Sequence, residues 1–306
     1  MKISVLQQQA VFGYDQLTET PAMDWLRQQA QRNVEHTLEM LEEAGRRGSD
    51  LAVTTEVVNM SACWADMRVP YPELYEGLNG PTVQQFAAMA KKWKMHVVAG
   101  LYLTLEGKTY NCAVLFDDEG KIIALHKKVH LPAGEEYQVT HGDRIEVFET
   151  KLGRIAMLVC WDLQFPEAAR VAALKGADLI VCPTLGWENI YGLSRAYENS
   201  VYIAAAMGFG PGGLDKCCDP ACIVDNMGRI LAAAQRGGSE VVTCEADITQ
   251  EPAPQYGSQN YGGFDSMRKT RFNQRRPQVY QLLVESNENT PLYDRYFMKN
   301  RDKCVK

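Results

Sequence analysis

Residues 155–170 read IAMLVCWDLQFPEAAR, and this stretch decides how we interpret the rest of the chain. Ile155–Val159 is a short aliphatic run of the kind that forms a buried strand. The pattern then becomes helical over Phe165–Lys175, with Pro166 in the first turn. Cys160 therefore lies on a tight turn between a strand and a helix.

A cysteine in this position is exposed at the edge of a sheet and close to the N-terminus of a helix. The free N–H groups and the dipole of the helix favour a thiolate there. Cys160 is therefore a candidate nucleophile. The alternative is that Cys160 is a small buried thiol with a packing role, as most cysteines are. The stretch alone leaves both interpretations open.

The composition is that of an ordinary globular protein. Of the 306 residues, 46% are hydrophobic and 23% are charged. The net charge of -6 provides no basic surplus to neutralise phosphates, so we expect no nucleic-acid partner.

The sequence also indicates where the protein works. The N-terminal residues MKISVLQQQ lack the apolar core of a signal peptide, and no stretch approaches the roughly 18 apolar residues of a membrane span. Nine scattered cysteines indicate free thiols in a reducing compartment rather than a disulfide framework. We expect a cytoplasmic protein with no membrane partner.

Strand-like and helical segments alternate along most of the chain, with hairpins between them. This order predicts an α/β fold with many strands, arranged as two sheets with helices outside. No linker or change in composition divides the chain before about residue 250. We therefore predict one domain over residues 1–250 and a C-terminal arm over 251–306 that packs on the domain or on a partner subunit.

Three of the predicted strands end in reactive side chains. Glu56 follows LAVTT, Lys127 and Lys128 follow IIALH, and Cys160 follows IAMLV. Functional sites of open α/β sheets collect at the carboxyl ends of the strands. A carboxylate can take the thiol proton, an ammonium can stabilise an oxyanion, and a thiolate can attack a carbonyl carbon. The alternative is that Glu56 and the lysines are solvated surface charges.

The segments around these residues resemble the nitrilase superfamily, also called the carbon–nitrogen hydrolases. LAVTTE ends at Glu56, HKKVHLP covers 126–132, and LVCWDLQFPEAAR surrounds Cys160. YNCAVLFDDEGKI, ALKGADLIVCPT and RRPQVY also match, in the order found in the family. The resemblance therefore extends over nearly the whole chain.

The resemblance implies a four-layer α-β-β-α sandwich and a Glu–Lys–Cys triad. It makes Glu56 the general base and Cys160 the nucleophile. Lys128 fits the family spacing because it stands two residues before His130, whereas Lys127 fits less well.

The family also has a second glutamate, at a fixed distance before a Gly-Asp pair. Gly142-Asp143 makes Glu135 the better match for it, with Glu136 as the alternative. The resemblance further implies that the backbone N–H of Trp161 is the second oxyanion donor.

The residues after the cysteine bear on the substrate. Many family members have Tyr and Arg where this chain has Trp161 and Gln164. Members that act on N-carbamoyl amino acids hold the substrate carboxylate with arginines just after the cysteine, and Leu163-Gln164 supplies none. The sequence Cys-Trp-Asp-x-x-Phe-Pro-Glu-Ala-Ala-Arg that starts at Cys160 is instead similar to that of the N-carbamoylputrescine amidases, whose substrate is cationic at its far end. We also select Trp187 as a pocket residue, because it follows the strand beside the Cys160 helix.

These features predict a thiol amidohydrolase that cleaves a non-peptide C–N bond of a small linear amide or N-carbamoyl amine and releases ammonia. We expect no metal and no cofactor. The cluster Cys217-Cys218 with Cys222 lacks the spacing of a zinc site. Alternatives are nitrile hydrolysis, acyl or amidotransfer by the same triad, and a non-catalytic binding or scaffold protein. The family precedent also predicts a homodimer or a larger even-numbered homo-oligomer.

Overall fold

The computed structural model describes residues 1–10, 22–59, 72–254 and 264–290. The chain divides into two compact units, Met1–Pro252 and Ala253–Lys306. No helix in the described ranges is long and apolar enough to cross a membrane.

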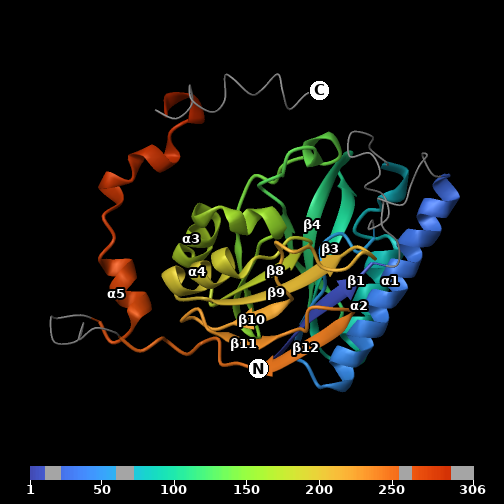
Figure 1. The fold of residues 1–306 in the computed structure, drawn as a ribbon, viewed down its shortest axis with the longest axis horizontal. Coiled ribbons are helices and arrows are strands. Elements are labelled where there is room, and N and C mark those ends of the chain that lie inside the picture. The colour runs from blue at the N-terminus through green and yellow to red at the C-terminus, as the bar shows by residue number, and fades with distance from the viewer. Residues whose placement is uncertain (11–21, 60–71, 255–263, 291–306) are drawn as a thin grey trace. The chain divides into compact units, whose positions relative to one another are not determined.

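The first half of unit 1 is a set of five neighbouring strands with two helices (Figure 1). The strands lie in the order β5-β4-β3-β2-β1. Their bounds are β1 Lys2–Gln9, β2 Leu51–Val53, β3 His96–Leu105, β4 Lys108–Phe116 and β5 Ile122–Lys127, and the helices are α1 Met23–Arg46 and α2 Pro81–Trp93.

The second half repeats this plan with the strand order β9-β8-β7-β6. Its elements are β6 Val147–Thr150, β7 Gly153–Met157, α3 Pro166–Leu174, β8 Leu179–Thr184, α4 Asn189–Asn199 and β9 Tyr202–Phe209. Three more strands, β10 Cys222–Val224, β11 Ile230–Ala233 and β12 Glu240–Glu245, pair at the side of this arrangement.

Alternation along the strands explains the layers. In β2, Leu51 and Val53 belong to the interior core that also contains the side chains of β7, β8 and β9. Ala52, between them, faces the second core, which α1 and α2 cover with residues such as Leu41 and Phe86. Figure 1 shows α1 and α2 on one flank of the strands and α3 and α4 on the other.

These layers confirm the predicted α/β sandwich, with one difference in connectivity. The two predicted sheets are joined into one hydrogen-bonded sheet of twelve strands. The junction is the short parallel pairing of β1 with β9, in which Gln7–Gln9 lie beside Met207–Phe209. Because β1, β2, β7, β8 and β9 form parallel pairs, β2, β7 and β8 end near a common edge.

Within the second unit, the described segments are α5 Met267–Asn273 and the short 3-10 turns η7 Pro277–Val279, η8 Gln281–Val284 and η9 Asn287–Asn289. Ser266 caps α5 by accepting a hydrogen bond from the Lys269 backbone N–H at 3.1 Å. Val279, Leu283 and Val284 expose most of their apolar side chains. The packing of the predicted arm over 251–306 stays a prediction, and 255–263 and 291–306 lie outside the described residues.

Candidate active site

Cys160 lies on a turn between a strand and a helix, as predicted, because β7 ends at Met157 and α3 starts at Pro166. It begins the 3-10 turn η5 Cys160–Gln164, which the sequence did not predict. The backbone of Cys160 has a φ of 45°, which is uncommon for any residue but glycine. Such a conformation persists only where neighbouring contacts hold it.

Asp162 supplies those contacts. Its fully buried carboxylate accepts a hydrogen bond from the Val159 backbone N–H at 3.0 Å, which closes the turn around Cys160. It also accepts bonds from the Val129 and His130 backbone N–H groups at 3.1 and 2.8 Å.

Two imidazoles complete the shell of Asp162. His126 Nε2 and His130 Nδ1 each lie 2.9 Å from its carboxylate oxygens. Burial opposes ionisation, but these hydrogen bonds outweigh it and hold the pKa of Asp162 well below its usual range. The Cys160 turn and the segment that carries Lys128 are therefore fixed to one ionised group.

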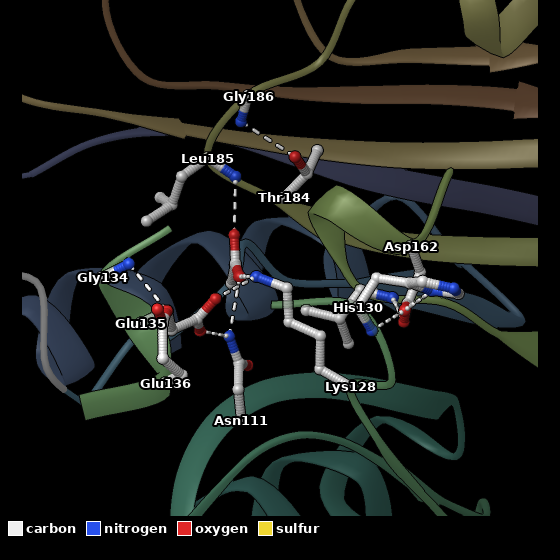
Figure 2. Close-up of polar contacts among 12 residues, drawn as sticks. Asn111, Lys128, His130, Gly134, Glu135, Glu136, Asp162, Thr184, Leu185 and Gly186 are labelled. Carbon is white, nitrogen blue, oxygen red and sulfur yellow. Dashed lines mark hydrogen bonds and ion pairs between the residues drawn. The ribbon is translucent and has the colours of Figure 1, made fainter. Parts of the chain in front are cut away.

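Glu56, Lys128 and Glu135 form a buried charged cluster. Lys128 Nζ donates to Glu56 Oε1 at 2.8 Å and to Glu135 Oε2 at 2.7 Å, and all three side chains are at most 1% exposed. Figure 2 shows the Lys128 ammonium reaching toward Glu135 and Asn111. Burial alone would lower the pKa of Lys128, but the two carboxylates raise it far above its usual value. Burial, with the charge of Glu56, raises the pKa of Glu135.

Neighbouring hydrogen-bond donors complete the cluster. Asn111 Nδ2 donates at 2.7 Å to Glu56 Oε1 and also at 2.7 Å to Glu135 Oε1. The Tyr102 hydroxyl donates to Glu135 Oε1 at 3.0 Å, and the Leu185 backbone N–H donates to Glu56 Oε2 at 3.1 Å. Every carboxylate oxygen of the cluster therefore has a donor.

The thiol of Cys160 lies beside this cluster. The charges of Glu56 and Lys128 both act on this thiol. Burial and the Glu56 carboxylate raise the pKa of Cys160 to about 12, although Lys128, Thr184 and Leu185 act in the opposite direction. The expectation that the turn favours a thiolate is therefore wrong for the resting site, which holds a neutral thiol next to a carboxylate.

Comparison with known proteins identifies the family. Residues 10–253 match the family described as carbon-nitrogen hydrolase. The chain belongs to this family. It is 28% identical over 246 residues to an omega-amidase of Xenopus tropicalis, an alignment that covers 72% of this chain and 83% of the relative.

Solved structures of other carbon–nitrogen hydrolases share the fold. One from Helicobacter pylori has a TM-score of 0.72 at 23% identity, covering 94% of this chain and 98% of that one. An amidase from Nesterenkonia sp. AN1, with acrylamide added at its active-site cysteine, has a TM-score of 0.71 at 20% identity. That likeness covers 93% of this chain and all of the amidase, and it confirms the nitrilase-like sandwich.

In this carbon–nitrogen hydrolase, the two candidate lysines lie in different surroundings, and so do the two candidate glutamates. Lys128 lies in the cluster, whereas the Lys127 ammonium lies 3.9 Å from the Tyr110 ring centroid. Glu135 is buried, whereas Glu136 is exposed and accepts a hydrogen bond from the Gly134 backbone N–H at 2.7 Å (Figure 2). The geometry therefore supports Lys128 and Glu135, whose roles remain predictions.

The two tryptophans have different surroundings. Trp161 follows Cys160 directly, and its side chain is 39% exposed. Trp187 is fully buried, and its Nε1 donates to Asn189 Oδ1 at 2.9 Å. Its ring packs against the Tyr191 ring with 5.5 Å between the two ring centroids, which is a contact within the core. This position does not favour the predicted role of Trp187 in a substrate pocket.

Four further residues of the site were not predicted from the sequence: Asn111, Tyr102, Thr184 and Asp162. Asn111 left a usable signal, since it is an amide within the otherwise apolar run of β4. Asp162 could have been selected because it stands two residues after the candidate nucleophile. Thr184 ends β8 in the same way as Glu56 follows β2. Tyr102 has no signal, because a tyrosine on a buried strand is ordinary packing.

The described residues hold no group of three or more His, Cys, Asp or Glu side chains placed to bind a metal ion. The seven cysteines within the described ranges are free thiols. Cys217 is exposed and lies 3.1 Å from Asp215 Oδ1.

Proposed function

We propose that this carbon–nitrogen hydrolase is a thiol amidohydrolase in which Cys160 is the nucleophile, Glu56 the general base and Lys128 an oxyanion donor. The observation that carries the proposal is the position of the Leu185 backbone N–H. It donates to Glu56 Oε2 at 3.1 Å and also favours the Cys160 thiolate, and the charge of Glu56 acts on the same thiol, so the base and the nucleophile lie in one site.

The first half of the reaction forms a thioester. The Cys160 thiol transfers its proton to Glu56 as the sulfur attacks the carbonyl carbon of the substrate. Lys128 uses two of its three N–H bonds on Glu56 and Glu135, which leaves the third for the oxyanion. The Trp161 backbone N–H is the second oxyanion donor. Glu56 then gives its proton to the leaving nitrogen, the C–N bond breaks, and ammonia departs.

The second half releases the acid. Glu56 takes a proton from water as the hydroxyl attacks the thioester carbon. The same two donors stabilise the second oxyanion, and the C–S bond breaks with the proton returned to sulfur. Glu135 holds the Lys128 ammonium in place through both halves and keeps it charged. No step uses a metal or an organic cofactor.

We propose a small linear amide or an N-carbamoyl amine as the substrate. Amide hydrolysis is supported by the omega-amidase relatives from Xenopus and from Saccharomyces cerevisiae. Leu163-Gln164 provides no cation for a substrate carboxylate at this position, which favours substrates whose far end is neutral or positively charged.

An ammonia-release assay tests this proposal. The panel contains N-carbamoyl amines, N-carbamoyl amino acids, short aliphatic amides, ω-amides and the matching nitriles. We expect release from an amide or carbamoyl amine, with about a thousand-fold loss in Cys160→Ala and in Glu56→Gln. Turnover of nitriles alone would replace the amidase assignment. Full activity of Cys160→Ala would reject the thiol mechanism.

A further inference from the structure

The Asn111 side chain bridges two carboxylates and leaves its own oxygen without a partner. Both N–H bonds of its amide are used at 2.7 Å, one on Glu56 Oε1 and the other on Glu135 Oε1. Asn111 Oδ1 is buried and has no hydrogen-bond partner among the described residues. A buried acceptor without a donor costs stability, so the amide is oriented by its two donor bonds to the carboxylates.

The backbone of Asn111 does not require this amide. Its carbonyl accepts the Lys128 backbone N–H at 2.8 Å, and its strand pairs with β3 opposite Tyr102. Any residue that fits a strand could make these main-chain contacts. The orientation of the amide toward the carboxylates is therefore a property of the charged cluster.

A count of acceptor positions shows what the amide does. A carboxylate oxygen offers about two positions to donors. Glu56 Oε1 has both filled, by Lys128 Nζ at 2.8 Å and by Asn111, whereas Oε2 has one donor, the Leu185 backbone N–H.

The second carboxylate repeats the arrangement. Glu135 Oε1 has two donors, Tyr102 and Asn111, whereas Oε2 has only Lys128 at 2.7 Å. Asn111 is the donor common to both filled oxygens. Each carboxylate therefore has its one open position on Oε2.

We propose that Asn111 is a positioning residue that closes Oε1 of Glu56 to protons, so that every proton transfer with Cys160, the leaving nitrogen and water uses Oε2. This inference rests on the proposed function, in which Glu56 is the base. Oε2 is also the oxygen that accepts the Leu185 backbone N–H, a donor that favours the Cys160 thiolate, so the open position lies toward the proton to be moved.

Without the amide, Glu56 Oε1 would keep only the Lys128 donor and Glu135 Oε1 only the Tyr102 donor, so each oxygen would have a position open to a proton. Two carboxylates that share one site favour holding a proton between them. The groups around that proton are the Lys128 ammonium, the Tyr102 hydroxyl and the Cys160 thiol. A proton held on Oε1 would occupy the base without serving the reaction. Higher pH would remove it and restore the base.

The test is kcat/KM as a function of pH for wild type, Asn111→Leu and Asn111→Ser. Leucine removes the bridging donors and the unpartnered acceptor at similar size, and serine keeps one hydroxyl donor. We expect the acidic limb of Asn111→Leu to move up by about one pH unit for the lost hydrogen bond, and that of Asn111→Ser by less. The loss relative to wild type should therefore shrink as the pH rises.

A loss that is the same at every pH in both variants would overturn the inference, because general structural damage has no such dependence. If Asn111→Leu does not fold, Asn111→Ser alone decides, by the same criterion. Failure of the proposed function has a different signature: wild type would form no acyl adduct on Cys160, and Cys160→Ala would keep its activity. A wild-type adduct together with an unshifted limb in the folded variant rejects the role of Asn111 alone.

Discussion

Asp162 Oδ2 accepts a hydrogen bond from His126 Nε2 at 2.9 Å, which ties the turn of Cys160 to the strand that delivers Lys128. The Asp162 carboxylate is fully buried and also holds backbone N–H groups on both segments. The separation of the candidate nucleophile from the candidate oxyanion donor therefore depends on a charged residue that touches neither of the reacting groups.

Asp162→Asn is expected to lower both stability and turnover. An amide can accept fewer of these bonds and places a donor against the imidazoles, so we expect a loss of about 3 kcal/mol in the free energy of unfolding. Asp178→Asn is the matched control, because Asp178 is a buried aspartate that pairs with Arg154 at 3.0 Å away from the cluster. Denaturant unfolding and kcat of the folded enzyme should separate them, with kcat falling only in Asp162→Asn.

The same carboxylate predicts acid sensitivity with a definite sign. Because the pKa of Asp162 is lowered in the folded state, its contribution to stability is complete at neutral pH and is lost as the pH falls below about 4. Asp162→Asn should therefore show a weaker decline of stability between pH 5 and pH 2 than wild type, on the order of one proton less in the slope. Equal slopes in thermal unfolding across that range would contradict the assignment.

The titration of Cys160 should respond in opposite directions to its two charged neighbours. Glu56 raises the pKa of the thiol and Lys128 lowers it. Glu56→Gln should therefore move the thiolate titration to lower pH than in wild type, and Lys128→Met should move it to higher pH. The measurement is thiolate absorbance near 240 nm, with the matching Cys160→Ser protein subtracted in each case. Shifts of the same sign in both variants would show that burial, and not these charges, governs the thiol.

The adjacent glutamates should differ sharply. Glu135→Gln removes a carboxylate that holds Lys128 at 2.7 Å, and we expect about a hundred-fold loss of kcat. Glu136→Gln changes an exposed group that accepts a hydrogen bond from the Gly134 backbone N–H, and its kcat should stay within about two-fold of wild type. Steady-state ammonia release measures both. A large loss in Glu136→Gln with activity kept in Glu135→Gln would reverse the assignment.

The exposed apolar residues of η8 give a test of the predicted homo-oligomer. Leu283→Asp places a charge on the apolar segment, and Gln281→Asp adds the same charge without removing an apolar side chain. If this segment packs against a second copy, Leu283→Asp should lower the sedimenting mass and Gln281→Asp should not. A monomeric wild-type protein in sedimentation velocity would reject the oligomer itself.

The sequence was sufficient for the fold because buried strands and amphipathic helices carry strong periodicity. Strand β7 overlaps the predicted strand over Ile155–Val159, and helix α3 lies within the predicted helix over Phe165–Lys175. The continuity of the sheet could not be predicted, because the pairing of Gln7–Gln9 with Met207–Phe209 joins residues far apart in the chain.

Within the site, the sequence located charged residues at strand ends but not their mutual contacts. Its thiolate expectation for Cys160 was wrong because desolvation and the charge of Glu56 outweigh the nearby donors. Tyr102 was missed because a phenol on β3 acquires meaning only when Glu135 folds over it, and Asn111 left no more than an amide in an apolar run, which does not name its partners. Such roles depend on tertiary proximity, which local patterns do not carry.

The central claim is that Cys160 carries the acyl group during turnover. The direct measurement is mass spectrometry of enzyme quenched in acid while it hydrolyses an amide from the ammonia-release panel. We predict an added acyl mass on the peptide that contains Cys160, which disappears when the substrate is exhausted and is absent in Cys160→Ser. Ammonia release with no adduct on that peptide, and with activity retained in Cys160→Ser, would contradict the account.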